Sequence, residues 1–186
     1  MAPAFLRARG PIDNRCPRGK VLVTRRAKSE VPTEDSGDLA KARTAAVKLL
    51  ARRDFASTEL KQKLQAQGFE ASVVDEAVGE LTTAGILNDT RYAEQFVTHH
   101  AERGQGPVRI TALLREQGLP DETIEAALAA GPDWRARARE VRIRRFGLRE
   151  PANWPEKAKQ GRFLQYRGFS SDHIRAALGP DFDLDE

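Results

Sequence analysis

The sequence predicts an all-α protein, an elongated, curved array of three tandem three-helix repeats. Helices are indicated by composition, because 31% of the 186 residues are charged and only 6% are aromatic, a balance typical of helical surfaces. The repeats are indicated by glycines that recur every fifty residues, at Gly68, Gly118 and Gly168. Because a unit of about 45 residues cannot bury enough apolar surface alone, we expect neighbouring units to stack.

The residues around these glycines recur as well. Each glycine follows a leucine by four positions and directly precedes an apolar residue, and three further small or apolar positions come later: Leu64, Phe69, Val74, Ala77 and Val78; Leu114, Leu119, Ile124, Ala127 and Leu128; Leu164, Phe169, Ile174, Ala177 and Leu178. Glycine just past a helix adopts the left-handed conformation without a Cβ penalty, and the next apolar residue contacts one a turn back. The pattern predicts a helix, a glycine stop and a second helix, three times over.

A further helix is expected upstream of each pair. In order along the chain these helices span about 39 to 53, 89 to 103 and 133 to 146, and they carry the apolar residues Val47, Leu49 and Leu50; Tyr92, Phe96 and Val97; and Trp134, Ala138 and Val141. The last helix of each repeat buries a stripe at positions i, i+3, i+4 and i+7, as Val74, Ala77, Val78 and Leu81 do. Each repeat therefore contains three helices.

Helix start signals agree with these boundaries. Asp89 and Asp133 lie at N-cap positions, Ser57 precedes the second helix of the first repeat, and Pro107 and Pro155 suit first-turn positions. The expected organisation is a basic, disordered tail over residues 1–38, repeats over 39–88, 89–132 and 133–180, and an acidic end over 181–186. A stray strand over 20–24 is a minor alternative.

Charge and cysteine content exclude several classes of protein. Residues 1–28 carry eight basic residues against Asp13, a net +7, whereas residues 29–186 carry a net −3; a uniformly basic DNA-coating domain is therefore not supported. Cys16 is the only cysteine, which excludes an intrachain disulfide and a thiolate zinc site. Without an apolar run of about 20 residues or a secretory core we expect a cytoplasmic protein and no membrane partner. An organellar transit peptide is the minor alternative.

The sharpest local cluster of charge lies between residues 135 and 149. It has a net charge of +6, from Glu140 and the arginines at positions 135, 137, 139, 142, 144, 145 and 149. We expect these arginines to lie on the side of their helix opposite Trp134, Ala138 and Val141. Since Glu140 is the one acid within the segment, a binding role is favoured over a merely solvated face.

Two further arginines follow the turn that contains Gly104 and Gly106. Arg109 and Arg115 are candidate ligand contacts, with an ordinary surface role as the alternative. Arg103 ends the preceding helix, where a cation also favours the helix dipole, so a structural role is preferred for it. No strand precedes this turn and no Lys-Ser/Thr follows it; a tight interhelical turn is therefore expected, not a phosphate-binding loop.

No catalytic or metal-binding set can be assembled. His99 and His100 point about 100° apart on a helix, and His173 lies in another repeat, so metal ligation is not expected. Carboxylate pairs such as Asp121 and Glu122 have no partner in a cleft. We therefore expect no cofactor and no enzyme activity.

Three aromatic side chains could stack on nucleic-acid bases. The candidates are Trp134, Trp154 and Tyr166. At helical spacing such residues more often pack within or between repeats, which is the interpretation we favour for all three.

Four segments resemble recurring stretches of the RecX family of regulatory proteins. The run GQGPVRI at 104–110, followed by Leu114 and Gly118, is similar to a signature of that family, and RDFASTELKQKL at 53–64, NDTRYA at 88–93 and RFLQYRGFS at 162–170 are similar to its other stretches. The resemblance covers about residues 40 to 180. Asn88 stands where the family often has an acid, and the basic tail is not a family feature.

The resemblance implies a protein that binds the RecA filament on single-stranded DNA and modulates its recombinase, ATPase and coprotease activities, with inhibition as the favoured sign. It also agrees with the family's description as tandem three-helix units. We expect a monomer that contacts RecA or DNA through Arg109, Arg115, Arg135, Arg139, Arg142, Arg144, Arg145 and Arg149. The alternative is a helical-repeat protein that binds nucleic acid independently and without sequence preference.

Overall fold

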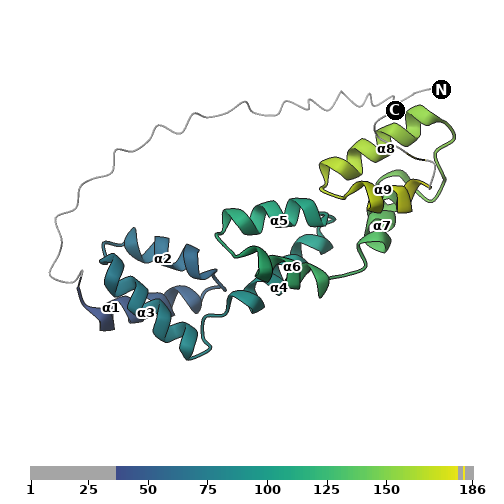
Figure 1. The fold of residues 1–186 in the computed structure, drawn as a ribbon. Helices are drawn as coiled ribbons and strands as arrows, with labels where there is room; N and C mark the ends of the chain where they lie inside the picture. The colour runs from purple at the N-terminus through teal and green to yellow at the C-terminus, as the bar shows by residue number, and fades with distance from the viewer. Residues whose placement is uncertain (1–36, 180–181, 183–186) are drawn as a thin grey trace, which may run out of the picture. The chain divides into compact units, whose positions relative to one another are not determined.

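The computed structural model describes residues 37–179 and 182. Over these residues it is all-α, as predicted, with nine helices and no strand (Figure 1). The helices are α1 (Leu39–Leu50), α2 (Ser57–Gln65), α3 (Ala71–Thr83), α4 (Asp89–Glu102), α5 (Pro107–Glu116), α6 (Asp121–Ala129), α7 (Trp134–Phe146), α8 (Trp154–Tyr166) and α9 (Ser171–Leu178). Residues 1–36 of the expected basic tail, the alternative strand at 20–24 and most of the acidic end lie outside the described residues. Asp38, the last residue of that expected tail, is the N-cap of α1.

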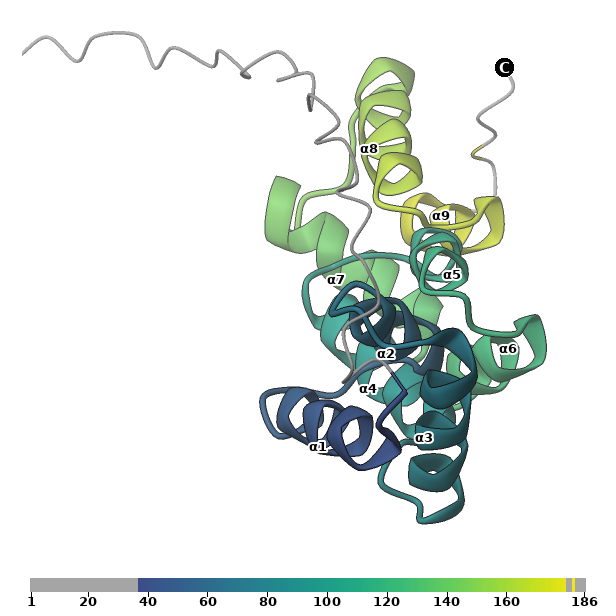
Figure 2. The ribbon, with the colours of Figure 1, turned by 90° about the vertical axis from the view of Figure 1, so that its left-hand side faces the viewer.

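The helices group into three consecutive triplets. The most extensive helix contacts lie within α1–α3, within α4–α6 and within α7–α9, and in each triplet the first helix packs mainly on the third. Figure 2 shows this arrangement in the first triplet, where α1 and α3 lie side by side and α2 lies above them. The prediction of three tandem three-helix repeats is confirmed.

Each repeat has its own hydrophobic core. Leu60, Leu64 and Val74 lie at the centre of the first, and Val97, Ile110 and Leu114 at the centre of the second. The third core is built around Ala138, Leu164 and Ile174, and Phe182, in the segment expected to be an acidic end, packs into it at 3% exposure.

The repeated glycines adopt the conformation that their spacing predicts. Gly68, Gly118 and Gly168 have φ angles of 97°, 78° and 87°, a region that favours glycine. In each repeat the amide of the next residue donates to the carbonyl of the leucine four positions before the glycine, for example Phe169 N to Leu164 O at 3.1 Å. These bonds close the helix ends as in a Schellman motif.

Two equivalent joints connect the repeats through these glycines. The Thr58 hydroxyl, at the start of α2, donates to the Gly118 carbonyl at 3.4 Å. The Val108 amide, fifty residues later at the start of α5, donates to the Gly168 carbonyl at 3.0 Å. The glycine turn of one repeat therefore packs on the first turn of the middle helix of the preceding repeat.

The predicted N-cap at Asp89 is wrong. Asn88 caps α4, with its side-chain oxygen accepting from Arg91 N at 2.9 Å. The carboxylate of Asp89 accepts instead from the Ser57 amide at 2.8 Å and the Ser57 hydroxyl at 2.6 Å. Asp89 thus satisfies amide and hydroxyl donors at the N-terminus of α2 and ties the first repeat to the second.

Candidate nucleic-acid interface

Helix α7 presents most of the predicted arginines. The carboxylate of Asp133 caps it, as expected, by accepting from Arg135 N at 2.9 Å and Ala136 N at 3.1 Å. The hydrogen bond from the Ala136 amide, together with that from Arg135, lowers the pKa of Asp133. Gly147, with φ of 88°, ends the helix.

The α7 arginines do not share one face of the helix. Arg139 and Arg142 line one surface hollow, together with residues of α9, whereas Arg144 and Arg145 line another beside the end of α4. Positions 139 and 144 are five residues apart, and at about 100° per residue they point away from each other. The structure therefore divides the cluster into two flanks.

Arg142 corrects the prediction that all these arginines lie on the outer side of α7. Its side chain is only 7% exposed, and Nη1 donates to the Arg149 carbonyl at 3.3 Å and to Gln160 Oε1 at 3.5 Å. The physical reason is that Arg142 lies one turn after the buried Ala138, on the same side of the helix. On the same flank, Arg139 Nε donates to the Ala176 carbonyl at 2.8 Å, at the end of α9. These two side chains hold the third repeat together.

Apart from Arg139, which bonds to the Ala176 carbonyl, four arginines of the 135–149 cluster are exposed and have no ion-pair partner in the described part of the chain. Within residues 37–179 and 182, no carboxylate pairs with the group Arg135, Arg144, Arg145 and Arg149. Arg137 differs, because its Nη1 lies 2.7 Å from Glu140 Oε2. The exposed positive charge therefore gathers at the two ends of α7 and in the loop that follows it.

The two predicted arginines of α5 have different surroundings. Arg115 Nε donates to Asp121 Oδ1 at 2.7 Å, and this hydrogen bond raises the pKa of Arg115. The exposed Arg109 has its guanidinium carbon 5.9 Å from the ring centre of Tyr166 on α8. Arg109 and Tyr166 thus form a cation–aromatic pair between the second and third repeats.

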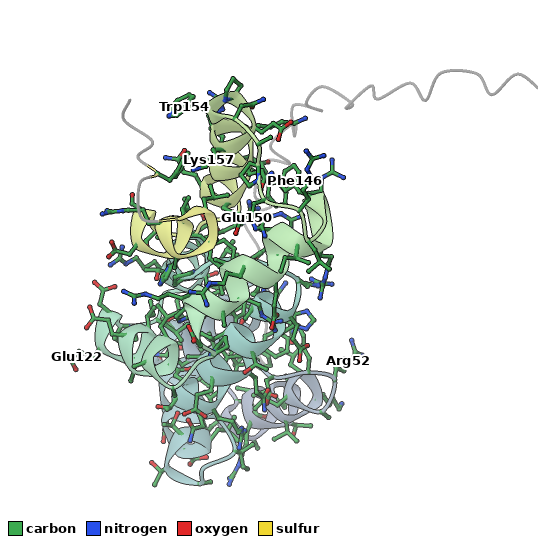
Figure 3. The ribbon with its side chains drawn as sticks, turned by 90° about the vertical axis from the view of Figure 1, so that its right-hand side faces the viewer. Arg52, Glu122, Phe146, Glu150, Trp154 and Lys157 are labelled. Carbon is green, nitrogen blue, oxygen red and sulfur yellow. The ribbon has the colours of Figure 1, made fainter. Side chains whose placement is uncertain are left out.

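The expectation that the aromatic candidates pack internally holds for one of them. Trp134 packs against the cores of the second and third repeats, and its Nε1 donates to the Leu128 carbonyl at 3.2 Å. The expectation is wrong for Tyr166, which is 78% exposed, and for Trp154, which is 47% exposed. Figure 3 shows Trp154 at the start of α8, pointing away from the helix.

A second cluster of arginines includes two that the sequence analysis did not identify as binding residues. Arg103 at the end of α4 and Arg167 at the end of α8 lie beside Arg144 and Arg145, and the four side chains line a cavity of about 120 Å³. We refer to it as the four-arginine cavity. Comparison of positions fifty residues apart could have identified Arg167. The equivalent positions in the other two repeats hold the uncharged Gln67 and Gln117, so the charge is specific to the third repeat.

The histidines have local roles. His100 stacks on Phe96 with ring centres 4.0 Å apart, and its Nδ1 lies 2.6 Å from Gln105 Oε1. His173 Nδ1 receives the Ser170 amide at 3.4 Å in a capping box at the start of α9. Among the described residues, no three His, Cys, Asp or Glu side chains are grouped as metal ligands. No helix in that part of the chain has the length and apolarity needed to cross a membrane.

The three tandem three-helix units of residues 37–179 define a helical-repeat protein. Comparison with family models gives three matches in order: the first three-helix domain of RecX at residues 42–81, the second at 88–128 and the third at 133–178. The chain belongs to the RecX family.

Curated relatives are similar over most of the chain. The regulatory protein RecX of Halorhodospira halophila is 46% identical over 145 residues, which span 77% of this chain and 90% of the relative. The protein of the same name from Pseudomonas fluorescens Pf-5 is 43% identical over 137 residues, spanning 73% and 88%. A crystal structure of RecX from Lactobacillus salivarius has the same fold, with a TM-score of 0.68 at 23% identity over 80% of this chain and 97% of that one.

Proposed function

We propose that this protein binds the RecA filament on single-stranded DNA and modulates its recombinase, ATPase and coprotease activities, with inhibition as the expected sign. Membership of the RecX family, whose curated relatives are named regulatory proteins, supports this function. The observation that carries the binding part is the group of exposed arginines at Arg135, Arg144, Arg145 and Arg149, which have no ion-pair partner among residues 37–179 and 182. The protein acts as a cytoplasmic monomer without a cofactor.

Electrostatics favours a partner that combines protein and phosphate. Separate basic clusters suit a nucleoprotein filament better than a uniform positive field does, because the filament exposes both materials together. Arg109, beside the exposed ring of Tyr166, adds a place where a base or a planar side chain can stack. Arg115 contributes less, because Asp121 already neutralises it.

The direct test measures RecA activity on single-stranded DNA. ATP hydrolysis and strand exchange are followed while this protein is titrated in below the RecA concentration. A change in both rates at substoichiometric amounts is the expected result, because a regulator of the filament acts through relatively few binding events. Unchanged rates would contradict the proposal.

The matched variants reverse two charges in different places. Arg135→Glu with Arg149→Glu changes exposed side chains that form no ion pair among the described residues, and circular dichroism checks that the fold is preserved. Arg52→Glu with Lys63→Glu makes the same charge change on exposed residues of the first repeat. We expect the first pair to weaken filament binding about tenfold or more, and the control pair to weaken it much less. Arg139 and Arg142 are unsuitable for this test, because both hold the third repeat together.

The second candidate function is independent binding of nucleic acid. The exposed pair of Tyr166 and Arg109 favours it, because single-strand binders combine a stacking ring with a cation. Affinity for RecA-coated strands compared with bare strands separates the two functions. A strong preference for the coated strand supports the filament regulator, and equal, steeply salt-dependent binding supports the alternative.

A further inference from the structure

The four-arginine cavity lies where helices of two neighbouring repeats end. Arg103 is the C-cap of α4 in the second repeat, Arg144 and Arg145 belong to the last turn of α7, and Arg167 is the C-cap of α8. The lining is completed by Gly104, Val141 and Phe163. Cations from three helices, far apart in the sequence, thus surround one small space.

The fold positions Arg167 in this cavity. Its Nη1 donates to the Arg103 carbonyl at 3.2 Å, and its guanidinium carbon lies 5.3 Å from the ring centre of Phe163. A Cβ atom at Gly104 would lie 3.9 Å from the same Nη1 and only 3.0 Å from Val141, so the guanidinium lies close to bare backbone. A guanidinium fixed in advance loses little conformational entropy when it binds a ligand.

The partial negative charges at the helix C-termini offset only part of the positive charge of the four arginines. Each helix C-terminus is equivalent to about −0.5 of an elementary charge, so three ends offset roughly 1.5 of the four positive charges. Within residues 37–179, no carboxylate forms an ion pair with any of the four arginines. Glu102, next to Arg103, lines a different hollow together with Glu94. A net positive charge of about 2.5 therefore remains at the cavity and favours an anionic ligand.

The size and chemistry of the cavity select a small oxyanion. Its volume of about 120 Å³ is well below the roughly 300 Å³ at which pockets for drug-sized ligands begin, so it suits a small ligand such as one tetrahedral oxyanion, and its four guanidinium groups favour an anion over a neutral base. Guanidinium groups donate in a planar fork that matches phosphate oxygens. We propose that the four-arginine cavity binds a single phosphate group in the backbone of single-stranded DNA. This assignment rests on the proposed function, because it names the group that the DNA presents to this surface.

Phosphate binding in this cavity also affects the contact between the second and third repeats. Arg103 belongs to the second repeat and the other three arginines to the third, so a phosphate held by both sides bridges the repeats. At the same joint the Gly106 amide donates to the Arg167 carbonyl at 2.8 Å. An occupied cavity therefore stabilises the joint between the second and third repeats.

The first experiment measures binding of a fluorescent oligothymidylate to the full chain without RecA, across a range of salt concentrations. Arg144→Gln with Arg145→Gln removes two cavity arginines that have no partner among the described residues. Arg52→Gln with Arg162→Gln removes two exposed arginines elsewhere and gives the same net charge; Figure 3 shows Arg52 projecting from the first repeat. We expect the cavity pair to lower affinity about tenfold and to reduce the salt slope by about 0.7, the value for one phosphate on a single strand. The control pair should cause a clearly smaller loss.

The second experiment separates a strand phosphate from free phosphate. The melting temperature of each protein is measured in inorganic phosphate and in chloride at equal ionic strength. General effects of phosphate on stability are the same in all three proteins. If the melting temperature rises further in phosphate for the unmodified chain and the control pair but not for the cavity pair, an oxyanion binds in the cavity. Inorganic phosphate should then also displace the oligonucleotide in competition.

The outcomes are distinct from those of the RecA assay. Equal loss of oligonucleotide affinity in the two pairs, or no loss in either, overturns the cavity as a phosphate site, even if RecA activity still responds to the protein. An extra phosphate-dependent rise in melting temperature without any difference in oligonucleotide affinity means that the cavity takes free phosphate only, and it overturns the assignment to a DNA strand. Loss of RecA modulation in the control pair alone would count against the proposed function and not against the cavity.

Discussion

At the scale of single residues, Gly106 is a position where a side chain would collide with the backbone of the next repeat. Its φ of −91° is accessible to any residue, yet a Cβ atom there would overlap the carbonyl of Gly168 and the amide of Phe169. Gly106→Ala should therefore lower the free energy of unfolding by about 1–3 kcal/mol, as overpacking does, measured by urea denaturation. Gly79→Ala is the control, because Gly79 lies within α3 with open space around it and alanine there should stabilise the helix by about 0.5–1 kcal/mol. Equal effects of the two substitutions would contradict the close contact at the joint.

The residues that could be predicted from the sequence are those governed by a local rule. The left-handed conformation of Gly68, Gly118 and Gly168 follows from their place at helix ends, and structure and prediction agree. The burial of Arg142 could not be predicted, because its neighbours Arg149 and Gln160 come from the loop and helix that fold back on α7. Arg103 could be explained from the sequence as a cation at a helix C-terminus, where the helix dipole favours it. Its place in the cavity depends on the ends of α7 and α8, which pack beside it in the fold.

At the scale of elements, the start of α9 should respond to pH. Burial, the largest effect, lowers the pKa of His173 below its ordinary value of 6.5; Arg135 lowers it further, whereas Asp172 and Asp133 oppose the shift. The fold thus favours the neutral ring, whose Nδ1 accepts from the Ser170 amide. Because the unfolded chain takes up the proton more readily, this stabilisation is complete above about pH 6.5 and decreases as the pH falls through the folded-state pKa.

His173→Gln provides the test. Glutamine at this position of a capping box can still accept from the Ser170 amide, but it does not titrate. Between about pH 7.5 and about pH 5.5 the unmodified chain should lose more stability than the variant, because the two chains differ only in the titrating side chain at position 173. Parallel losses, measured by thermal unfolding at each pH, would show that His173 is not the responsible group.

Helices were predictable as elements, whereas the bonds that link them were not. The helices expected to start near residues 39, 89 and 133 begin at Leu39, Asp89 and Trp134, because apolar spacing and turn residues mark such starts locally. The same N-cap rule that identified Asp133 misassigned Asp89. Its preferred partner, Ser57, is 32 residues away and belongs to the preceding repeat, and a local rule takes no account of that donor.

At the scale of the whole molecule, the net charge divides between two parts that should act differently. Residues 1–28 carry a net +7, yet the family models begin only at residue 42 and the H. halophila relative is matched over 90% of its length. Regulation of RecA, as proposed here, should therefore reside in the helical repeats, and the basic segment should add salt-dependent affinity for nucleic acid.

Deletion of residues 1–28 is expected to lower the salt slope of oligonucleotide binding by up to about 0.7 for each phosphate that this segment neutralises. Substoichiometric inhibition of RecA ATP hydrolysis at moderate salt should persist in the shortened chain. If inhibition disappeared while the repeats remained folded by circular dichroism, the regulatory surface would have to include the basic segment, and the assignment to the repeats would be wrong.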